Sequence, residues 1–303
     1  MARAGLVTSA GRPGTAHPVL LVLLAVVSVQ FGGALAATLL PLVGVVGSVA
    51  LRLTLSTAML WALVRPRVRG RSRADWAVVG LFSAALTCMN LAFYASLARL
   101  PIGVAVTIEF LGPLALAAAL SRQARDALAV LAALTGVVLI SEALTVPWAQ
   151  LDLTGMLLAA LAGACWAAYI VLSARTGARF EGLDGIAICL ALGAAVTLPL
   201  GLVTAGADLW QPRAILTGLG IALLSSAIPY SLELLALRHL AAGTFGVLLS
   251  LEPAAAALAG LLVLSQLLGP LQLLGMALVV VASIAVLGRR TGSTLSAAPD
   301  PSG

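Results

Sequence analysis

The sequence predicts an all-α integral membrane protein with ten transmembrane helices, arranged as two inverted repeats of five helices each. Hydrophobic residues make up 61% of the 303 residues, charged residues make up 9%, and the mean hydropathy is +1.12. This composition leaves too little polar surface for a soluble globule. Apolar runs of about 20 residues recur along the chain, which is the length that an α-helix needs to cross a bilayer. A stretch in the first half also returns in the second half at the same spacing.

Clusters of Pro, Gly or Arg separate the apolar runs. We expect each run to form a helix, because a helix satisfies its own backbone hydrogen bonds in lipid. In chain order the predicted helices are Pro18–Leu40, Val43–Val64, Asp75–Leu97, Pro101–Leu120, Asp126–Leu144, Asp152–Ala174, Leu183–Thr204, Ala214–Leu237, Ala241–Leu264 and Leu267–Gly288.

Two matching stretches, Met89–Pro113 and Pro229–Pro253, indicate a tandem duplication. An odd number of helices in each copy inverts the second copy in the membrane, as in many secondary transporters. The predicted organisation is a cytoplasmic tail over 1–17, a first repeat over 18–145, a second repeat over 152–288 and a disordered cytoplasmic tail over 289–303. The matching positions are Leu97, Leu100, Gly103 and Pro113 in the first copy, and Leu237, Leu240, Gly243 and Pro253 in the second.

The distribution of arginine predicts the orientation, because cytoplasmic loops carry the excess of positive charge. The chain has no lysine, and with the N-terminus inside, 14 of its 17 basic residues lie on the cytoplasmic side. We therefore expect a multi-pass protein of the bacterial inner membrane with both termini in the cytoplasm. The basic run Arg65–Arg73 has no interleaved aromatic residues, so it favours contact with anionic lipids over nucleic acid.

Several functions are disfavoured by the residues themselves. A chain without lysine cannot supply a P-loop, so ATP hydrolysis is not expected. The only histidines are His17 and His239, and the three cysteines have no ligand-like spacing. We expect no enzyme activity, no bound metal and no cofactor.

Ionisable residues inside the predicted helices are the first candidates for a functional site, because such residues are costly in a membrane. Arg52, Glu109 and Glu252 lie closest to the midplane, whereas Glu142 and Glu233 lie near helix ends and are weaker candidates. A structural ion pair between Arg52 and one of the two deep glutamates is the alternative explanation.

Two prolines and several polar residues extend this candidate site. Pro113 and Pro253 are expected to kink their helices and to free a backbone carbonyl close to an acidic residue in each repeat. The remaining candidates are three pairs of polar or aromatic residues at helical spacing, which could line one cavity, and one single residue. The pairs are Asn90 with Tyr94, Trp166 with Tyr169 and Tyr230 with Glu233, and the single residue is Gln30.

At these residues the sequence resembles the EamA-type drug/metabolite transporters, and within them the bacterial threonine/homoserine exporter branch. The resemblance is carried by Ser28–Leu55, Met89–Pro113, Asp152–Tyr169 and Ile228–Pro253, and it extends from about Leu20 to Leu287. Two departures are Ala37, where the branch can carry a lysine, and Ser265–Gln266, where it tends to carry Gly-Glu. The positions that match the motifs of the branch are Gln30, Arg52, Asn90, Tyr94, Glu109, Pro113, Trp166, Tyr169, Tyr230, Glu233, Glu252 and Pro253.

The resemblance implies a carrier of two EamA repeats that exports small amino acids such as threonine and homoserine, driven by proton antiport with alternating access. Its expected partners are the substrate, protons and membrane lipids, and a homodimer is an open alternative to a monomer. In this hypothesis Arg52 binds the substrate carboxylate, and Glu109 or Glu252 binds the ammonium group and carries the proton. The alternatives are a carrier for another solute, such as a nucleobase, a sugar derivative or a cationic drug, and a membrane scaffold that transports nothing.

Overall fold

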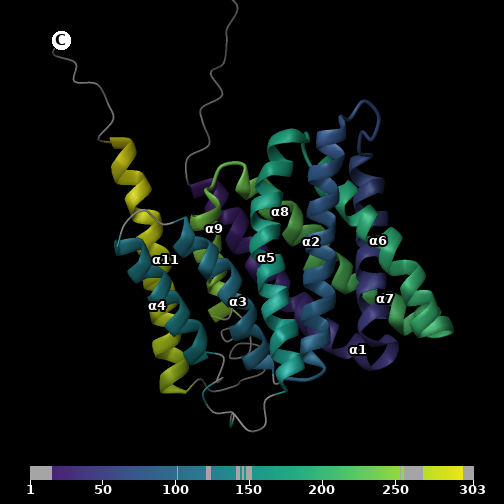
Figure 1. Cartoon of the computed structure of the whole chain (residues 1–303), viewed down its shortest axis with the longest axis horizontal. Helices are drawn as coiled ribbons and strands as arrows, with labels where there is room; N and C mark the ends of the chain where they lie inside the picture. The colour runs from purple at the N-terminus through teal and green to yellow at the C-terminus, as the bar shows by residue number, and fades with distance from the viewer. Residues whose placement is uncertain are drawn as a thin grey trace, which may run out of the picture.

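The computed structural model describes residues 16–100, 102–120, 124–140, 144, 147, 152–252, 254–255 and 269–295, and all regular structure in this part of the chain is helical. The helices stand roughly side by side (Figure 1). Their bounds are α1 Ala16–Val64, α2 Arg73–Leu97, α3 Ile102–Ala119, α4 Ala124–Ile140, α5 Leu153–Arg179, α6 Asp184–Ala205, the 3₁₀-helix η3 Gly206–Trp210, α7 Pro212–Ala222, the π-helical turn η4 Leu223–Ala227, α8 Ile228–Leu237, α9 Ala242–Leu249 and α11 Pro270–Leu295.

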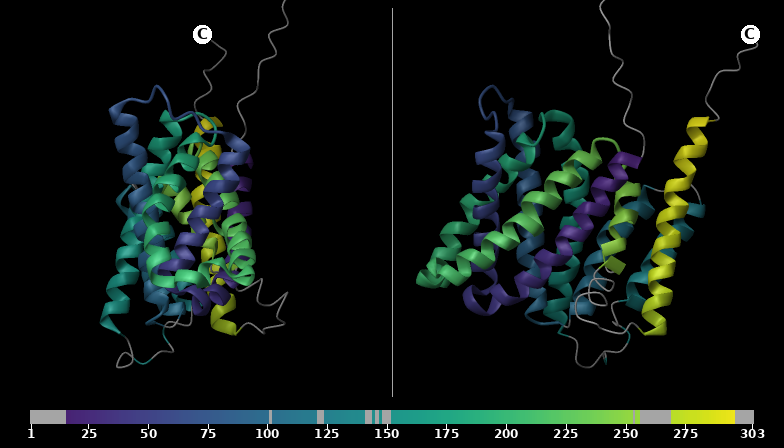
Figure 2. Two further views of the ribbon diagram at one scale, coloured as in Figure 1. Left: turned by 90° about the vertical axis from the view of Figure 1, so that its right-hand side faces the viewer. Right: turned by 180° about the vertical axis from the view of Figure 1, so that it is seen from behind.

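Element α1 contains the first two predicted helices. The backbone breaks at Gly44, which has a φ of 66° and a ψ of −175°. Residues with a Cβ rarely adopt this conformation, so glycine is needed at this point. The ribbon reverses direction there, and the two arms of α1 cross the molecule separately (Figure 2). The predicted boundary between Leu40 and Val43 lies next to the observed break.

The termini of two helices are specified by their sequences. Ser72 caps α2: its hydroxyl accepts a hydrogen bond from the backbone N–H of Asp75, and the Asp75 side chain accepts one from the backbone N–H of Ser72. Asp152 caps α5 by accepting hydrogen bonds from the backbone N–H groups of Thr154 and Gly155. Each cap satisfies donors that the first helical turn leaves without partners.

The predicted helix Ala214–Leu237 is observed as α7, η4 and α8 in succession, and the sequence analysis did not anticipate the π-helical turn. At the C-terminus α11 continues to Leu295, so the prediction of disorder from residue 289 onward is wrong for 289–295. The helix continues because Arg289 and Arg290 are good helix formers and no proline follows until Pro299. Pro253 and residues 256–268 lie outside the described residues.

Among the described residues, five helical segments are long and apolar enough to cross a membrane, and these are Thr38–Val64, Arg73–Leu97, Leu153–Arg179, Asp184–Trp210 and Pro212–Leu237. Shorter apolar helices accompany them. Helix α1 packs against α6, α7 and α8, α2 packs against α5, and α4 packs against α11 at one end of the molecule (Figures 1 and 2). The regular structure of the described residues is therefore all helical, and its long apolar helices are those of a membrane protein.

Helix α3 approaches α5 closely at two glycines. A Cβ built on Gly163 would lie 2.6 Å from the carbonyl oxygen of Glu109, and a Cβ on Gly112 would collide with the backbone of Gly163. Small residues allow this backbone contact between membrane helices. The contact brings Glu109 next to α5.

Candidate functional site

Arg52 is the centre of a buried polar network between helices. It lies on the second arm of α1, is 9% exposed, and donates hydrogen bonds to side chains from several other elements. Its Nε donates to Ser226 Oγ at 2.6 Å and its Nη2 donates to the carbonyl oxygen of Ser225, so one edge of the guanidinium faces η4. The other edge faces two tyrosine hydroxyls, with Nη1 to Tyr94 at 3.3 Å and Nη2 to Tyr230 at 2.9 Å.

The acceptors of Arg52 are neutral oxygen atoms. None of the ion pairs found within the described residues involves Arg52. Glu109 is near enough to interact with it electrostatically, and Glu109 itself is 7% exposed on α3. Among the described residues, Arg52 therefore bonds hydroxyl and carbonyl oxygens and does not form the ion pair with a glutamate that was the alternative explanation.

Tyr230 connects Arg52 to the other polar candidates. Its hydroxyl accepts a hydrogen bond from Asn90 Nδ2 at 3.2 Å, and its ring lies 5.5 Å from the Arg52 guanidinium carbon. The ring also lies 5.6 Å from that of Tyr169, whose hydroxyl donates to Glu233 Oε2 at 2.7 Å. Helices α2, α5 and α8 thus contribute one continuous chain of contacts.

Glu233 takes a different position from the one expected. We expected it near a helix end, where a carboxylate can reach the interface, but its side chain is only 5% exposed. Tyr169 is fully buried beside it. The structure therefore places Glu233 among the inner candidates.

The remaining candidates divide into those near this network and those outside it. Trp166 packs edge to face against Phe110, with ring centroids 4.8 Å apart. Phe110 directly follows Glu109 in the sequence. Glu252 is half-buried and interacts electrostatically with both Glu109 and Glu233. Glu109 and Glu233 therefore interact electrostatically with Arg52, and Glu252 interacts with these two glutamates.

Other predicted residues are not brought into the network. Gln30 is half-buried on the first arm of α1, and the contacts described above do not include it. Pro113 lies inside α3, where its carbonyl faces Gly246. Glu142, Pro253 and Ser265–Gln266 lie outside the described residues, and the side chain of Ala37 is not described.

The sequence analysis missed Ser225 and Ser226. Serine is common in membrane helices, so neither residue carries a signal by type alone. Pro229 does carry one, because a proline has no N–H to offer the carbonyl four residues before it. That carbonyl belongs to Ser225, the acceptor of Arg52.

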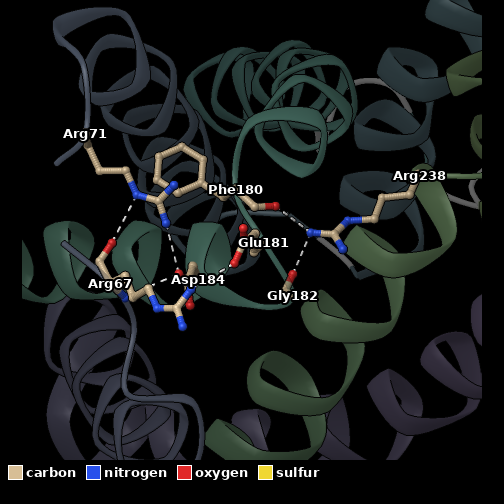
Figure 3. A network of polar contacts seen from close by, with 7 residues as sticks. All are labelled: Arg67, Arg71, Phe180, Glu181, Gly182, Asp184 and Arg238. Atoms are coloured by element: carbon tan, nitrogen blue, oxygen red, sulfur yellow. Dashed lines mark hydrogen bonds and ion pairs between the residues drawn. The ribbon is translucent and has the colours of Figure 1, made fainter. Parts of the chain in front are cut away.

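A second polar cluster joins three loops at one end of the bundle (Figure 3). Asp184 accepts hydrogen bonds from the backbone N–H of Arg67 at 3.2 Å and from Arg71 Nη2 at 3.0 Å. Arg71 also lies over the Phe180 ring at 4.6 Å. Arg238, which follows α8, donates to the carbonyl oxygens of Phe180 and Gly182. The cluster ties the α1–α2 segment and the end of α8 to the turn between α5 and α6.

At the opposite end Arg99 and Asp152 form an ion pair at 3.0 Å. The backbone N–H of Gly155 and the guanidinium of Arg99 hold the pKa of the Asp152 carboxyl below its ordinary value of 3.8. Within the described ranges, no group of three or more His, Cys, Asp or Glu side chains is placed to hold a metal ion.

Comparison with known proteins places the chain among its relatives. It is 40% identical over 279 residues to the threonine/homoserine exporter RhtA of Escherichia coli K12, covering 92% of both chains. It is 39% identical over 284 residues to the RhtA protein of Salmonella typhimurium LT2, covering 94% of this chain and 93% of the relative. Residues 153–288 match the EamA-like transporter family. The chain belongs to this family.

Among EamA proteins it falls in the branch of the threonine/homoserine exporters. A solved structure, described only as "Crystal structure of protein", has the same fold, with a TM-score of 0.70 over 90% of this chain and 98% of that chain at 19% identity. The protein is therefore an exporter of the inner membrane and not an enzyme.

Proposed function

We propose that this EamA protein exports threonine, homoserine and similar small amino acids from the cytoplasm by proton antiport. The names of its relatives suggest the substrates. The observation that carries the proposal is Arg52, a buried cation whose hydrogen-bond partners are all neutral. Such a cation favours an anionic ligand, because burial weakens its solvation and no carboxylate among the described residues lies within ion-pair distance of it.

An amino acid zwitterion matches the charges that surround this position. Its carboxylate can pair with the planar guanidinium of Arg52 through two hydrogen bonds. Its ammonium group can approach Glu109 or Glu252, which interact electrostatically with one another across the site. Tyr94, Tyr230 and Trp166 then form the walls around a small side chain.

The acidic residues also suggest how protons are coupled to export. A buried glutamate that alternates between a proton and the substrate ammonium group exchanges one for the other. Glu109 and Glu252 are the proposed carriers, and Glu233 is a third candidate because of its burial. We expect Glu109→Gln or Glu252→Gln to abolish the pH dependence of transport. Full activity that stays pH-dependent in both variants would contradict the proton-carrier role.

We further propose ten membrane spans in two inverted EamA repeats, with both termini in the cytoplasm. Alternating access then requires the two repeats to move against each other. The cluster around Asp184 supports this scheme, because Arg67 and Arg71 of the first repeat bind the α5–α6 turn of the second (Figure 3). In the proposed orientation these are cytoplasmic contacts, and they must open when the site faces the cytoplasm.

A competition assay in proteoliposomes tests the substrate class. Proteoliposomes that contain the purified protein are loaded with unlabelled threonine. Labelled threonine is then added outside with an excess of unlabelled competitor, and its entry by exchange is measured. We expect homoserine and threonine to compete, and a nucleobase, a sugar derivative and a cationic drug to have no effect. Exchange of threonine no faster than in protein-free liposomes would contradict amino acid export and would direct the search to the other solutes.

A further inference from the structure

The π-helical turn η4 interrupts the α-helical path between α7 and α8. Its defining hydrogen bond joins the backbone N–H of Ile228 to the carbonyl oxygen of Leu223, five residues earlier. The next residue, Pro229, has no N–H to donate. Carbonyl groups of this turn are therefore left for partners outside their own helix, and turns of this kind are frequent at functional sites.

Helix α1 supplies these partners from both of its arms. Ser28 Oγ on the first arm donates to the Leu224 carbonyl at 2.7 Å. Arg52 on the second arm donates to the carbonyl of Ser225. A Cβ on Gly32 would collide with the Ser225 side chain, so the first arm lies directly on the turn.

The contacts divide the Arg52 guanidinium into two edges. The edge formed by Nε and Nη2 holds Ser226 Oγ and the Ser225 carbonyl, both from η4. The edge formed by Nη1 and Nη2 holds the hydroxyl oxygens of Tyr94 and Tyr230. The two hydroxyls accept from Nη1 and Nη2, the two nitrogen atoms that can donate together to one carboxylate in a bidentate pair.

We propose that Ser226 and the Ser225 carbonyl are positioning groups that fix one edge of Arg52, so that the opposite edge exchanges its two tyrosine hydroxyls for the substrate carboxylate. This inference rests on the proposed export of amino acids and specifies how the site recognises them. Arginine has a long side chain, and holding one edge in place lowers the entropy that is lost when the other edge binds a ligand.

The test compares variants that lose or keep the Ser226 hydroxyl with a variant of a second buried serine. Ser226→Ala and the similarly sized Ser226→Cys remove the hydroxyl that Arg52 Nε uses, and Ser226→Thr keeps it. Ser231→Ala is the matched control, because Ser231 is also a buried serine and, among the described residues, its hydroxyl donates to the Ala227 carbonyl of its own helix at 2.5 Å and not to Arg52. Each variant is purified, its folding is checked by size-exclusion chromatography, and threonine exchange is measured in proteoliposomes.

We expect Ser226→Ala and Ser226→Cys to raise the KM for threonine about tenfold, the usual effect of disturbing one charge-assisted hydrogen bond, with a maximal rate within about threefold of wild type. Threonine amide, which lacks the carboxylate, is the second probe. Wild type should prefer threonine over the amide strongly, and the preference should fall in both variants. Ser226→Thr and Ser231→Ala should behave like wild type.

Two outcomes would overturn the inference. One is a folded Ser226→Ala protein whose KM for threonine stays within twofold of wild type. The other is an equal loss of affinity for threonine and for threonine amide, since this would indicate general damage. If the wild-type protein itself exchanges neither threonine nor homoserine, the proposed function fails and this inference fails with it. If wild type exchanges threonine, and Ser226→Ala and Ser226→Cys exchange it with the same KM, the proposed function stands and the inference fails.

Discussion

The hydrogen bond between Tyr169 and Glu233 allows a quantitative test of the inner network. Tyr169 is fully buried, Glu233 is 5% exposed, and the hydroxyl-to-carboxyl distance is 2.7 Å. Tyr169→Phe removes only the hydroxyl, because the ring keeps its contacts with Phe82 at 5.3 Å and Tyr230 at 5.6 Å. Glu233→Met removes the acceptor with little change in side-chain volume.

The expected magnitude follows from burial. Each single substitution leaves one buried polar group without its partner, which costs about 1 to 3 kcal/mol. Glu233→Met also gains apolar contact, so its net effect alone does not isolate the hydrogen bond. The double substitution leaves neither group behind. The cost of the double variant should therefore be smaller than the sum of the two single costs by about 1 to 3 kcal/mol.

Unfolding in mixed micelles by titration with sodium dodecyl sulfate measures all four proteins under one condition. The coupling energy of the cycle cancels the apolar contribution of methionine, because that contribution is present in both halves. Additive costs, within about 0.5 kcal/mol, would refute the argument that these two residues form one buried polar unit.

Three further predictions follow from other contacts. Gly163→Ala should lower the free energy of unfolding by about 1 to 3 kcal/mol, because the new Cβ would lie 2.6 Å from the Glu109 carbonyl oxygen. Gly80→Ala is the control, because nothing lies within 4 Å of the Cβ that it adds. Equal effects of the two substitutions would contradict the close approach of α3 and α5. Arg52→Lys should weaken threonine binding by about 10- to 100-fold, from about 1.5 to 3 kcal/mol for one lost charge-assisted hydrogen bond. Calorimetry on purified protein measures that loss, with Arg99→Lys as the control, and unchanged affinity would exclude carboxylate binding at Arg52. Because the pKa of Asp152 is lower in the folded protein, its contribution to stability is present above about pH 3.8 and is lost as the pH falls through the folded-state pKa. Melting profiles should therefore fall more steeply below about pH 4 in wild type than in Asp152→Asn, and identical profiles would contradict the cap.

Much of the inner site was predictable because charge is rare in membrane helices. Depth alone selected Arg52 and Glu109, and the structure brings them within electrostatic reach of each other. Helical spacing selected Tyr94, Tyr230 and Tyr169, which join the same network. The structure brings these candidates together because a buried charge requires polar neighbours, and few polar residues are available in such a chain. Their role in binding stays a prediction.

Other features depend on contacts that a helical pattern does not contain. The π-helical turn adds one residue to a helical turn without changing apolar composition, so hydropathy does not detect it. Glu233 was expected near the interface because it lies close to the end of a predicted helix. That distance does not reveal which neighbouring helices cover the side chain. The end of α11 was placed too early because a pair of arginines marks a membrane boundary, which need not be a helix boundary.

Accumulation of labelled threonine and homoserine in inside-out vesicles tests the central claim most directly. Vesicles containing the protein are compared with and without an imposed gradient that is acidic inside, and with vesicles that contain Arg52→Gln. Proton-driven export predicts accumulation that needs the gradient, disappears with an uncoupler and is absent in Arg52→Gln. Equal accumulation with and without the gradient would contradict proton antiport, and no accumulation in vesicles shown to contain folded wild-type protein would contradict amino acid export.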